Sequence, residues 1–143
     1  MRRRNTLLGV GAVATLALFA YWQSRAPDHV KPTGTTVGEA IVTVQVPAIE
    51  GNAAIGKRIF DSACAACHGA NAAGTNGLAP PLVHKVYEPG HHADEAFQRA
   101  AALGVKSHHW PFGDMPPVSG LTRGDVTMII TYIRELQRAN GIH

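Results

Sequence analysis

The feature that most constrains this chain is the run Cys64-Ala65-Ala66-Cys67-His68. A Cys-x-x-Cys-His run is the attachment sequence of a c-type haem. Two thiols three positions apart on one helical turn can add to the two vinyl groups at one porphyrin edge, and the next imidazole then lies under the iron. Cys64 and Cys67 are the two cysteines of the chain, so neither has a competing partner. The run predicts one haem c, bound covalently through Cys64 and Cys67, with His68 as an iron ligand.

Other uses of a Cys-x-x-Cys pair fit the chain less well. A zinc site of this kind needs a second pair of cysteines, which the chain lacks. A thioredoxin-like redox motif follows a strand in a βαβ unit, whereas the residues before Cys64 have the pattern of a helix. A chance match of five residues stays open until the flanking sequence is considered.

The positive charge of the chain belongs to its first 25 residues. The net charge of the 143 residues is +3, but Arg2, Arg3, Arg4 and Arg25 lie at the start, and all acidic residues follow. The rest carries nine basic and ten acidic side chains. Nucleic-acid binding therefore has no support, and the length allows one small domain with an appendage.

Residues 1–25 have the pattern of an N-terminal transmembrane anchor. Arg2–Arg4 precede the uncharged run Thr6–Trp22, whose 17 residues lie at the lower limit for spanning a bilayer. Arginines favour the cytoplasmic side of a membrane, and the aromatic residues Tyr21 and Trp22 lie where they would meet the opposite interface. This orientation would place the remaining chain in the periplasm of a bacterium. A cleaved signal peptide is the alternative, although Pro27 would directly follow the best cleavage site, Ser24–Ala26.

Residues 26–50 are punctuated by proline and glycine and lack long apolar periodicity. Two arrangements stay open for this stretch. It is either a flexible linker, with a root-mean-square reach of roughly 25–30 Å, or a segment wrapped on the domain surface. The weak alternation of residues 41–46 allows one short extended segment.

Residues 51–143 have the pattern of three helices separated by long loops. The first helix begins near Asn52 or Ala53 and runs into Cys64, with Ile55, Ile59 and Phe60 on one face. A glycine inside a helix costs about 1 kcal/mol relative to alanine. Gly56 therefore indicates that another helix approaches closely at this position.

The second and third helices carry end signals. The second runs from about Ala93 to Leu103 and stops at Gly104, with an inward face of Ala96, Phe97, Ala100 and Leu103. The third is capped by Thr122 and ends at Asn140-Gly141, with an apolar stripe of Val126, Ile129, Ile130, Ile133 and Leu136. Asp125 is the reciprocal partner of the Thr122 cap. This core is too sparse to fold well alone, so a buried macrocycle would supply the missing apolar mass.

Residues 51–141 resemble the class I c-type cytochromes in four features that occur in the right order. These are the Gly-x-x-x-Phe before the first cysteine, the Cys-x-x-Cys-His run, a Trp-x-x-x-x-Met-Pro-Pro run over residues 110–117, and an aromatic residue, Tyr132, in the last helix. The resemblance implies an all-α cytochrome c fold in which Gly56, Phe60 and Tyr132 meet where the terminal helices cross. It also implies that the Pro80 carbonyl accepts a hydrogen bond from His68.

The resemblance makes Met115 the second axial ligand of the iron. Met115 lies 47 residues after His68 in a loop stiffened by two prolines, which holds a ligand with little entropy to lose. His108 or His109 as the sixth ligand, and an open site, are the alternatives. The resemblance further implies that the indole of Trp110 binds a haem propionate, although plain core packing also fits.

Two parts of the sequence depart from the family pattern. The stretch from His84 to His92 and the pair His108-His109 match none of its motifs, and they are read as polar surface residues. The lysine ring found around the haem edge of mitochondrial members is also missing. A metal-handling role for these histidines is the third and least favoured function.

A haem with both axial positions filled suits one-electron transfer and no bond-making catalysis. We therefore predict a respiratory electron carrier, not an enzyme, which is tethered to the inner membrane and exchanges electrons with redox proteins such as membrane respiratory complexes. Docking is expected at a small apolar haem edge formed by Ala65, Ala66, Ala70, Ala72 and Ala73. The alternative function is a haem enzyme or ligand sensor with an open or displaceable sixth position.

Overall fold

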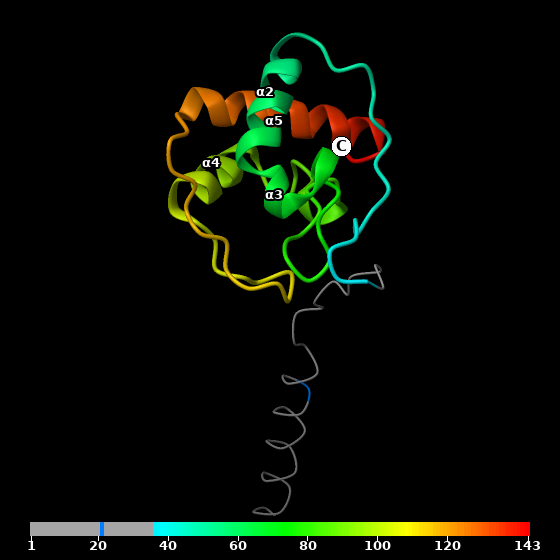
Figure 1. Ribbon diagram of the computed structural model, residues 1–143, viewed down its shortest axis with the longest axis vertical. Helices are drawn as coiled ribbons and strands as arrows, with labels where there is room; N and C mark the ends of the chain where they lie inside the picture. Colours follow the sequence, from blue (N-terminus) through cyan, green and yellow to red (C-terminus); the bar gives the residue numbers. More distant parts are fainter. Residues whose placement is uncertain (1–20, 22–35) are drawn as a thin grey trace, which may run out of the picture.

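The computed structural model describes Tyr21 and residues 36–143 (Figure 1). Its helices are α2 (Gly51–Ala63), α3 (Ala65–His68), α4 (Asp94–Leu103) and α5 (Arg123–Ala139), with single 3₁₀ turns η1 (Ala70–Ala72) and η2 (Lys85–Tyr87). The all-α prediction is confirmed for these residues, which contain isolated bridges but no strand. The anchor predicted for residues 1–25 lies outside the described residues, apart from Tyr21. No helix of the described part is long and apolar enough to cross a membrane.

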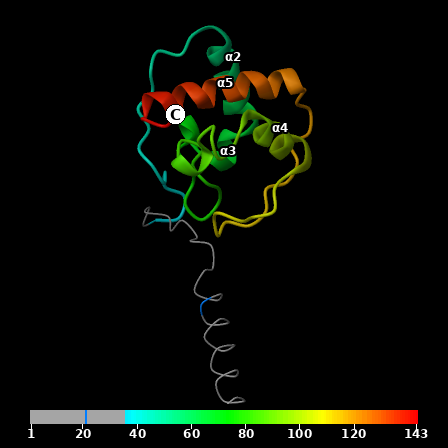
Figure 2. The same ribbon diagram turned by 180° about the vertical axis from the view of Figure 1, so that it is seen from behind.

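The frame of the domain is the crossing of α2 over α5, which both views show (Figures 1 and 2). At Gly56 the helices approach so closely that a β-carbon would lie 1.9 Å from the carbonyl oxygen of Met128. The rings of Phe60 in α2 and Tyr132 in α5 pack with their centroids 5.6 Å apart. The helix contact predicted at Gly56 is confirmed, as is the meeting of the two aromatic residues.

Two apolar residues expected to face inward do not. Ile55 is 40% exposed and Leu103 is 72% exposed. The side of α2 that meets α5 carries Ala53, Gly56 and Phe60, and Ile55 lies about 100° away from Gly56 around the helix. Leu103 is the last residue of α4, directly before the turn at Gly104. The predicted α5 stripe is confirmed, since all five of its members are buried.

The ends of α5 match their signals. The hydroxyl of Thr122 accepts a hydrogen bond from the backbone N–H of Asp125, while the Asp125 carboxylate accepts one from the Thr122 N–H. This reciprocal capping box satisfies two of the backbone donors that a helix N-terminus leaves free. The helix ends at Ala139, one residue before the predicted stop.

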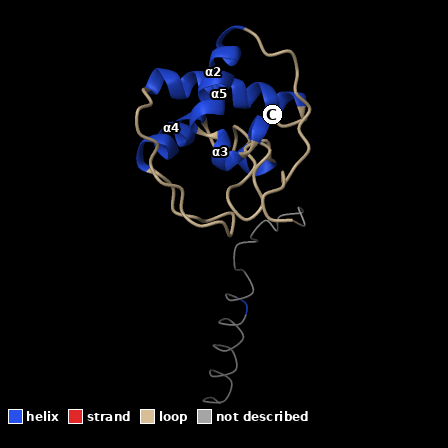
Figure 3. Ribbon diagram, viewed as in Figure 1, coloured by secondary structure: helices blue, strands red, loops and turns tan. Residues whose placement is uncertain are grey.

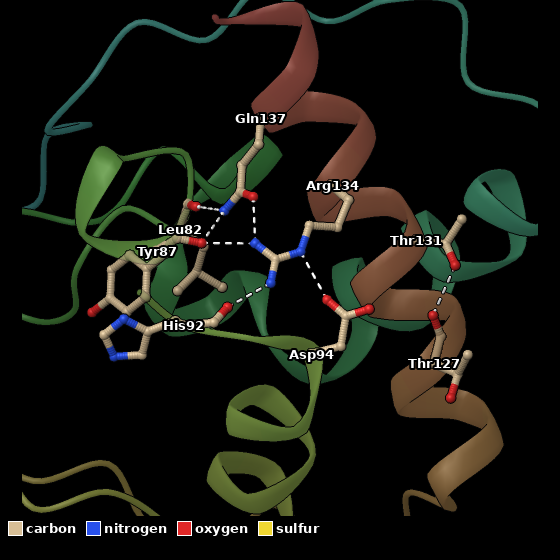
Figure 4. Close-up of polar contacts among 8 residues, drawn as sticks. All are labelled: Leu82, Tyr87, His92, Asp94, Thr127, Thr131, Arg134 and Gln137. Carbon is tan, nitrogen blue, oxygen red and sulfur yellow. Dashed lines mark hydrogen bonds and ion pairs between the residues drawn. The ribbon is translucent and has the colours of Figure 1, made fainter. Parts of the chain in front are cut away.

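Loops make up most of the rest of the domain (Figure 3), and α5 secures the one before α4 with polar side chains. The buried Arg134 guanidinium donates to the backbone oxygens of Tyr87 (2.7 Å) and His92 (2.6 Å) and to the Asp94 carboxylate (2.9 Å) (Figure 4). The fully buried Gln137 amide donates to the carbonyls of Leu82 and Tyr87 and accepts from Arg134. Loop carbonyls that would otherwise be buried without a donor are satisfied in this way.

The described part of the 26–50 stretch, residues 36–50, lies on the domain surface, which is the second arrangement left open for it. The backbone N–H groups of Ile41 and Val42 both donate to the carbonyl of Ala73, at 3.1 Å. Gln45 exchanges two hydrogen bonds with the Asn140 side chain at the end of α5. Ile41 is buried. Residues 36–50 are therefore a surface strap and not a free linker.

Candidate haem site

The Cys-x-x-Cys-His run forms a single turn directly after α2. The backbone leaves the helix at Cys64, where φ is −122°, and its N–H donates to the carbonyl of Phe60. The N–H groups of Cys67 and His68 then both donate to the Cys64 carbonyl, at 3.1 and 2.9 Å. Both cysteines are free thiols, with Cys64 half-buried and Cys67 exposed. Phe60 is anchored in the core by Tyr132, so the position of the turn depends on the α2–α5 crossing.

The Cys64 thiol is neutral at physiological pH. Burial, and to a smaller degree the neighbouring Cys67, raise the pKa of Cys64 to about 11. A thiol with a raised pKa is a poor spontaneous nucleophile and a poor metal ligand. Cys64 therefore does not resemble the activated cysteines of redox enzymes.

His68 is fixed in one orientation and one protonation state. The residue is 8% exposed, and its Nδ1 lies 2.9 Å from the carbonyl oxygen of Pro80. Because a carbonyl can only accept, Nδ1 carries the proton and Nε2 keeps its lone pair. Burial lowers the pKa of His68, and the bond to Pro80 offsets part of that effect. This is the arrangement of a metal-ligating histidine, whose second nitrogen is held by a backbone carbonyl.

The loop between His68 and Pro80 is held tightly to the turn. The N–H of Gly74 donates to the His68 carbonyl at 2.7 Å. Gly74 has φ +75°, and a β-carbon there would lie 2.5 Å from the nitrogen of Pro81. The site thus needs a glycine at this position, because a side chain would push the Pro80 carbonyl away from His68.

Trp110 carries a buried polar atom that is not satisfied. The residue is 4% exposed, and among the residues that the structure describes, its Nε1 is the buried side-chain nitrogen without a hydrogen-bond partner. Burial raises the pKa of the neighbouring Tyr87 phenol to about 12, and the indole lowers it in part. The two groups nevertheless do not reach hydrogen-bond geometry. A buried indole N–H usually has a partner, so Nε1 is available to an acceptor that the chain itself does not supply.

Met115 lies at the base of the loop that carries Trp110. Its N–H and carbonyl exchange hydrogen bonds with Val105, at 3.0 and 2.9 Å. Gly104 adopts φ +75°, and a β-carbon there would lie 2.5 Å from the Met115 carbonyl. The loop is further closed by the ion pair of Lys106 with Asp114. Met115 is half-buried and has little backbone freedom.

The two loops meet through aromatic rings. The rings of His84, four residues after Pro80, and Trp110 form a T-shaped pair with their centroids 5.2 Å apart. The sequence-predicted residues are therefore arranged in two groups, with Cys64, Cys67, His68 and Pro80 in one and Trp110 with Met115 in the other.

This donor set fits a covalent haem. Two free thiols and one neutral imidazole share a turn, and a carbonyl orients the imidazole. The unsatisfied Nε1 of Trp110 suits an anionic acceptor such as a propionate. Cys64 and Cys67 would hold the macrocycle and His68 would bind its iron.

One expectation about the surface near this turn is wrong. Ala72 is fully buried and Ala73 is 7% exposed, because Ala72 adopts φ +58° and its carbonyl accepts from Leu82. The apolar surface next to the cysteines is formed by Ala66 and Ala70, both exposed, with Ala65 half-buried. The exposed edge is therefore smaller than predicted.

Two groups of residues were not assigned a place from the sequence. Arg134 and Gln137 were not recognised, although they share a face of α5 with Ile130 and Ile133. Their place on the apolar face of the helix is the one sequence signal that would have indicated that these two polar side chains are buried. The four histidines at positions 91, 92, 108 and 109 were recognised but not located; the structure brings them together at one surface.

Burial lowers the pKa of both His92 and His109, and neighbouring histidines in the cluster lower it further.

The comparisons with known proteins agree with this geometry. A family model described as Cytochrome c matches residues 53–137, a range that contains the cysteine turn, both loops and nearly all of α2 and α5. A comparison with curated proteins finds no match. Proteins of the matched family bind haem covalently through a Cys-x-x-Cys pair, here Cys64 and Cys67. The chain therefore belongs to the cytochrome c family and is a haem-binding electron carrier in the general sense of that family.

Proposed function

We propose that this protein is a one-electron carrier whose haem iron is held between His68 and Met115, and that it catalyses no bond-making reaction. The observation that carries the proposal is the His68 imidazole, fixed by Pro80 with Nε2 free, on the same turn as both cysteines. When bound, the haem supplies an iron that changes its charge by one electron. A histidine and methionine pair raises its reduction potential relative to other ligand sets.

The protein's contribution is to hold both ligands still. The Pro80 carbonyl positions His68. The backbone N–H and carbonyl of Met115 each form a hydrogen bond with the backbone of Val105. Of the two methionines in the described part, Met128 belongs to α5, where its carbonyl packs on Gly56. Met115 is thus the loop methionine with a constrained backbone. Fixed ligands keep the geometry similar in both oxidation states, which favours fast electron exchange.

We also place this carrier in a bacterial respiratory chain, tethered by residues 1–25 to the inner membrane with its domain in the periplasm. The support is the arginine-flanked apolar run. Retention of the full chain in membranes after alkaline extraction is the measurement for the tether; release into the supernatant would argue against it. Donor and acceptor would dock at the small exposed edge around Ala66 and Ala70, in transient contacts of low area.

The test of the ligand assignment is the spectrum of the oxidised, haem-loaded protein. We expect the weak far-red absorption band of ferric haem bound to a thioether sulfur. Met115→Ala should abolish this band and lower the midpoint potential. Met128→Leu is the matched control and should leave both unchanged, because Met128 lies in α5.

Two results would contradict the proposal. A high-spin ferric spectrum of the unmutated protein, or rapid carbon monoxide binding at neutral pH, would indicate an open sixth position and favour a haem enzyme or ligand sensor. A far-red band that survives Met115→Ala would show that another residue supplies the sulfur.

A further inference from the structure

Two histidine pairs that the electron-transfer site does not use meet at one surface of the domain. His91 and His92 lie just before α4, and His108 and His109 lie in the loop that Val105 and Met115 close. The His109 ring has its centroid 5.2 Å from that of His91 and 5.3 Å from that of His92. Residues distant in sequence thus place several imidazoles within reach of one point.

The imidazole nitrogens are spaced as the ligands of a small metal ion. Nε2 of His91 and Nε2 of His109 lie 3.4 Å apart. A tetrahedral ion with metal–nitrogen bonds of about 2.0–2.1 Å has ligand atoms roughly 3.3–3.4 Å from each other. The ligand atoms of His91, His92 and His109 all lie within 4.8 Å of one another. Small rotations of the side chains therefore bring the third nitrogen into the same coordination sphere.

The surroundings orient the ligands before any ion binds. Nδ1 of His92 is occupied by the carbonyl of Val86 at 2.6 Å, which leaves Nε2 as the ligand atom. Histidines that bind metals are commonly held by a backbone carbonyl in this way. The His92 backbone is in turn fixed by Arg134, whose Nη2 donates to its carbonyl. The loop that carries His109 is closed by Lys106 and Asp114.

We propose that His91, His92 and His109 form a binding site for a borderline divalent transition-metal ion, Cu²⁺ or Zn²⁺, separate from the haem iron. Three imidazoles with no carboxylate among them suit copper and zinc and disfavour Mg²⁺ and Ca²⁺, which prefer oxygen ligands. Three protein ligands also leave a coordination position open to solvent or another ligand. His108 lies beside the site but is not among the histidines whose ligand atoms all lie within 4.8 Å of one another, and we do not assign it as a ligand. This site rests on the proposed function in one respect, because it needs a His109 that is not bound to the haem iron.

The test is metal titration of the full, haem-loaded chain, purified in detergent without a histidine tag. ZnCl₂ and CuSO₄ are titrated separately by calorimetry, with MgCl₂ as the negative probe. We expect one equivalent of either transition metal to bind per chain, with Cu²⁺ tighter than Zn²⁺. The electron paramagnetic resonance spectrum of bound Cu²⁺ should show nitrogen hyperfine splitting. His91→Ala and His109→Ala should each weaken binding at least about 10- to 100-fold.

The controls separate this site from a diffuse histidine surface. His108→Ala changes the neighbour that is not assigned as a ligand, and His143→Ala changes an exposed histidine elsewhere; neither should shift the affinity by more than about threefold. The Soret spectrum reports whether each variant is folded. If His109→Ala disturbs it, the exposed His91 variant carries the test. Absence of stoichiometric binding, equal binding of Mg²⁺, or equal losses in the control and ligand variants would each overturn the proposal.

Discussion

The close approach at Gly56 predicts that one added methyl group destabilises the whole domain. In Gly56→Ala the new carbon would lie 1.9 Å from the Met128 carbonyl oxygen and 2.4 Å from its carbon, both backbone atoms. Because contacts below 3.0 Å are not tolerated, α2 and α5 must separate by at least about 1.1 Å at this point. No side-chain rotation can relieve a clash with backbone.

The cost follows from what packs beside the glycine. Phe60 and Tyr132 are fully buried at this interface, and removing such a ring costs about 3–5 kcal/mol. A gap of up to about 1 Å forfeits roughly a quarter to a half of each contact, so the two rings together lose about 2–4 kcal/mol. Alanine regains about 1 kcal/mol through its helix propensity. We expect a net loss in the free energy of unfolding of about 2 kcal/mol.

The assay is guanidinium chloride unfolding of the haem-loaded protein, followed by far-ultraviolet circular dichroism. The variants are compared where the dependence of the unfolding free energy on denaturant has the same slope. Gly124→Ala is the matched control. Gly124 is also a helical glycine, but a β-carbon there meets nothing closer than the Thr122 hydroxyl at 3.6 Å, so this variant should be unchanged or up to about 1 kcal/mol more stable. If Gly56→Ala is as stable as the unmutated chain, the close approach of α2 and α5 at Gly56 does not limit the stability of the domain.

Two further predictions concern α5. Arg134→Met should cost about 3 kcal/mol, because it leaves the His92 carbonyl and the Gln137 side-chain oxygen without a donor. It should also speed amide exchange in residues 85–93; exposed Arg138→Met is the control and should change stability by less than about 0.5 kcal/mol. Exchange in that loop as slow as in the unmutated chain would contradict the role of Arg134. Thr122→Ala should cost about 1 kcal/mol. The hydrogen bonds of Thr122 lower the pKa of Asp125, so its contribution is complete above the ordinary aspartate pKa and is lost as pH falls through the lower folded value. Thermal unfolding from pH 6 to pH 2 should therefore show a smaller loss of stability in Thr122→Ala, and parallel curves would refute this.

Local signals in the sequence were sufficient for the helices and the turn. The α5 cap, its apolar stripe and the Gly56 contact each depend on spacings of three or four residues, which the chain displays directly. The hydrogen bond of His68 to Pro80 was expected because both residues belong to a family pattern with fixed spacing.

The contacts of Arg134 could not be predicted in the same way. Its partners include the carbonyls of Tyr87 and His92, and every residue carries a carbonyl, so nothing in the sequence marks these two as acceptors. The burial of Ala72 depends on a left-handed backbone conformation, which alanine rarely adopts. The histidine cluster forms where the loop before α4 meets the loop closed by Val105 and Met115. Neither loop has a residue periodicity that would predict this contact. In each case the information lies in the tertiary fold.

The dependence of the haem turn on α5 has a consequence for incomplete chains. Every cysteine and histidine of the proposed iron site precedes residue 69, and Met115 precedes α5. A product that stops before residue 123 therefore contains the whole attachment sequence but lacks Tyr132, Arg134 and Gln137, which hold the turn and its loops in place. Such a fragment still carries the sequence required for haem attachment. It lacks the helix that would pack around the cofactor and exclude water from it. The framework of the haem site thus depends on the final 21 residues, although the attachment sequence is complete at His68.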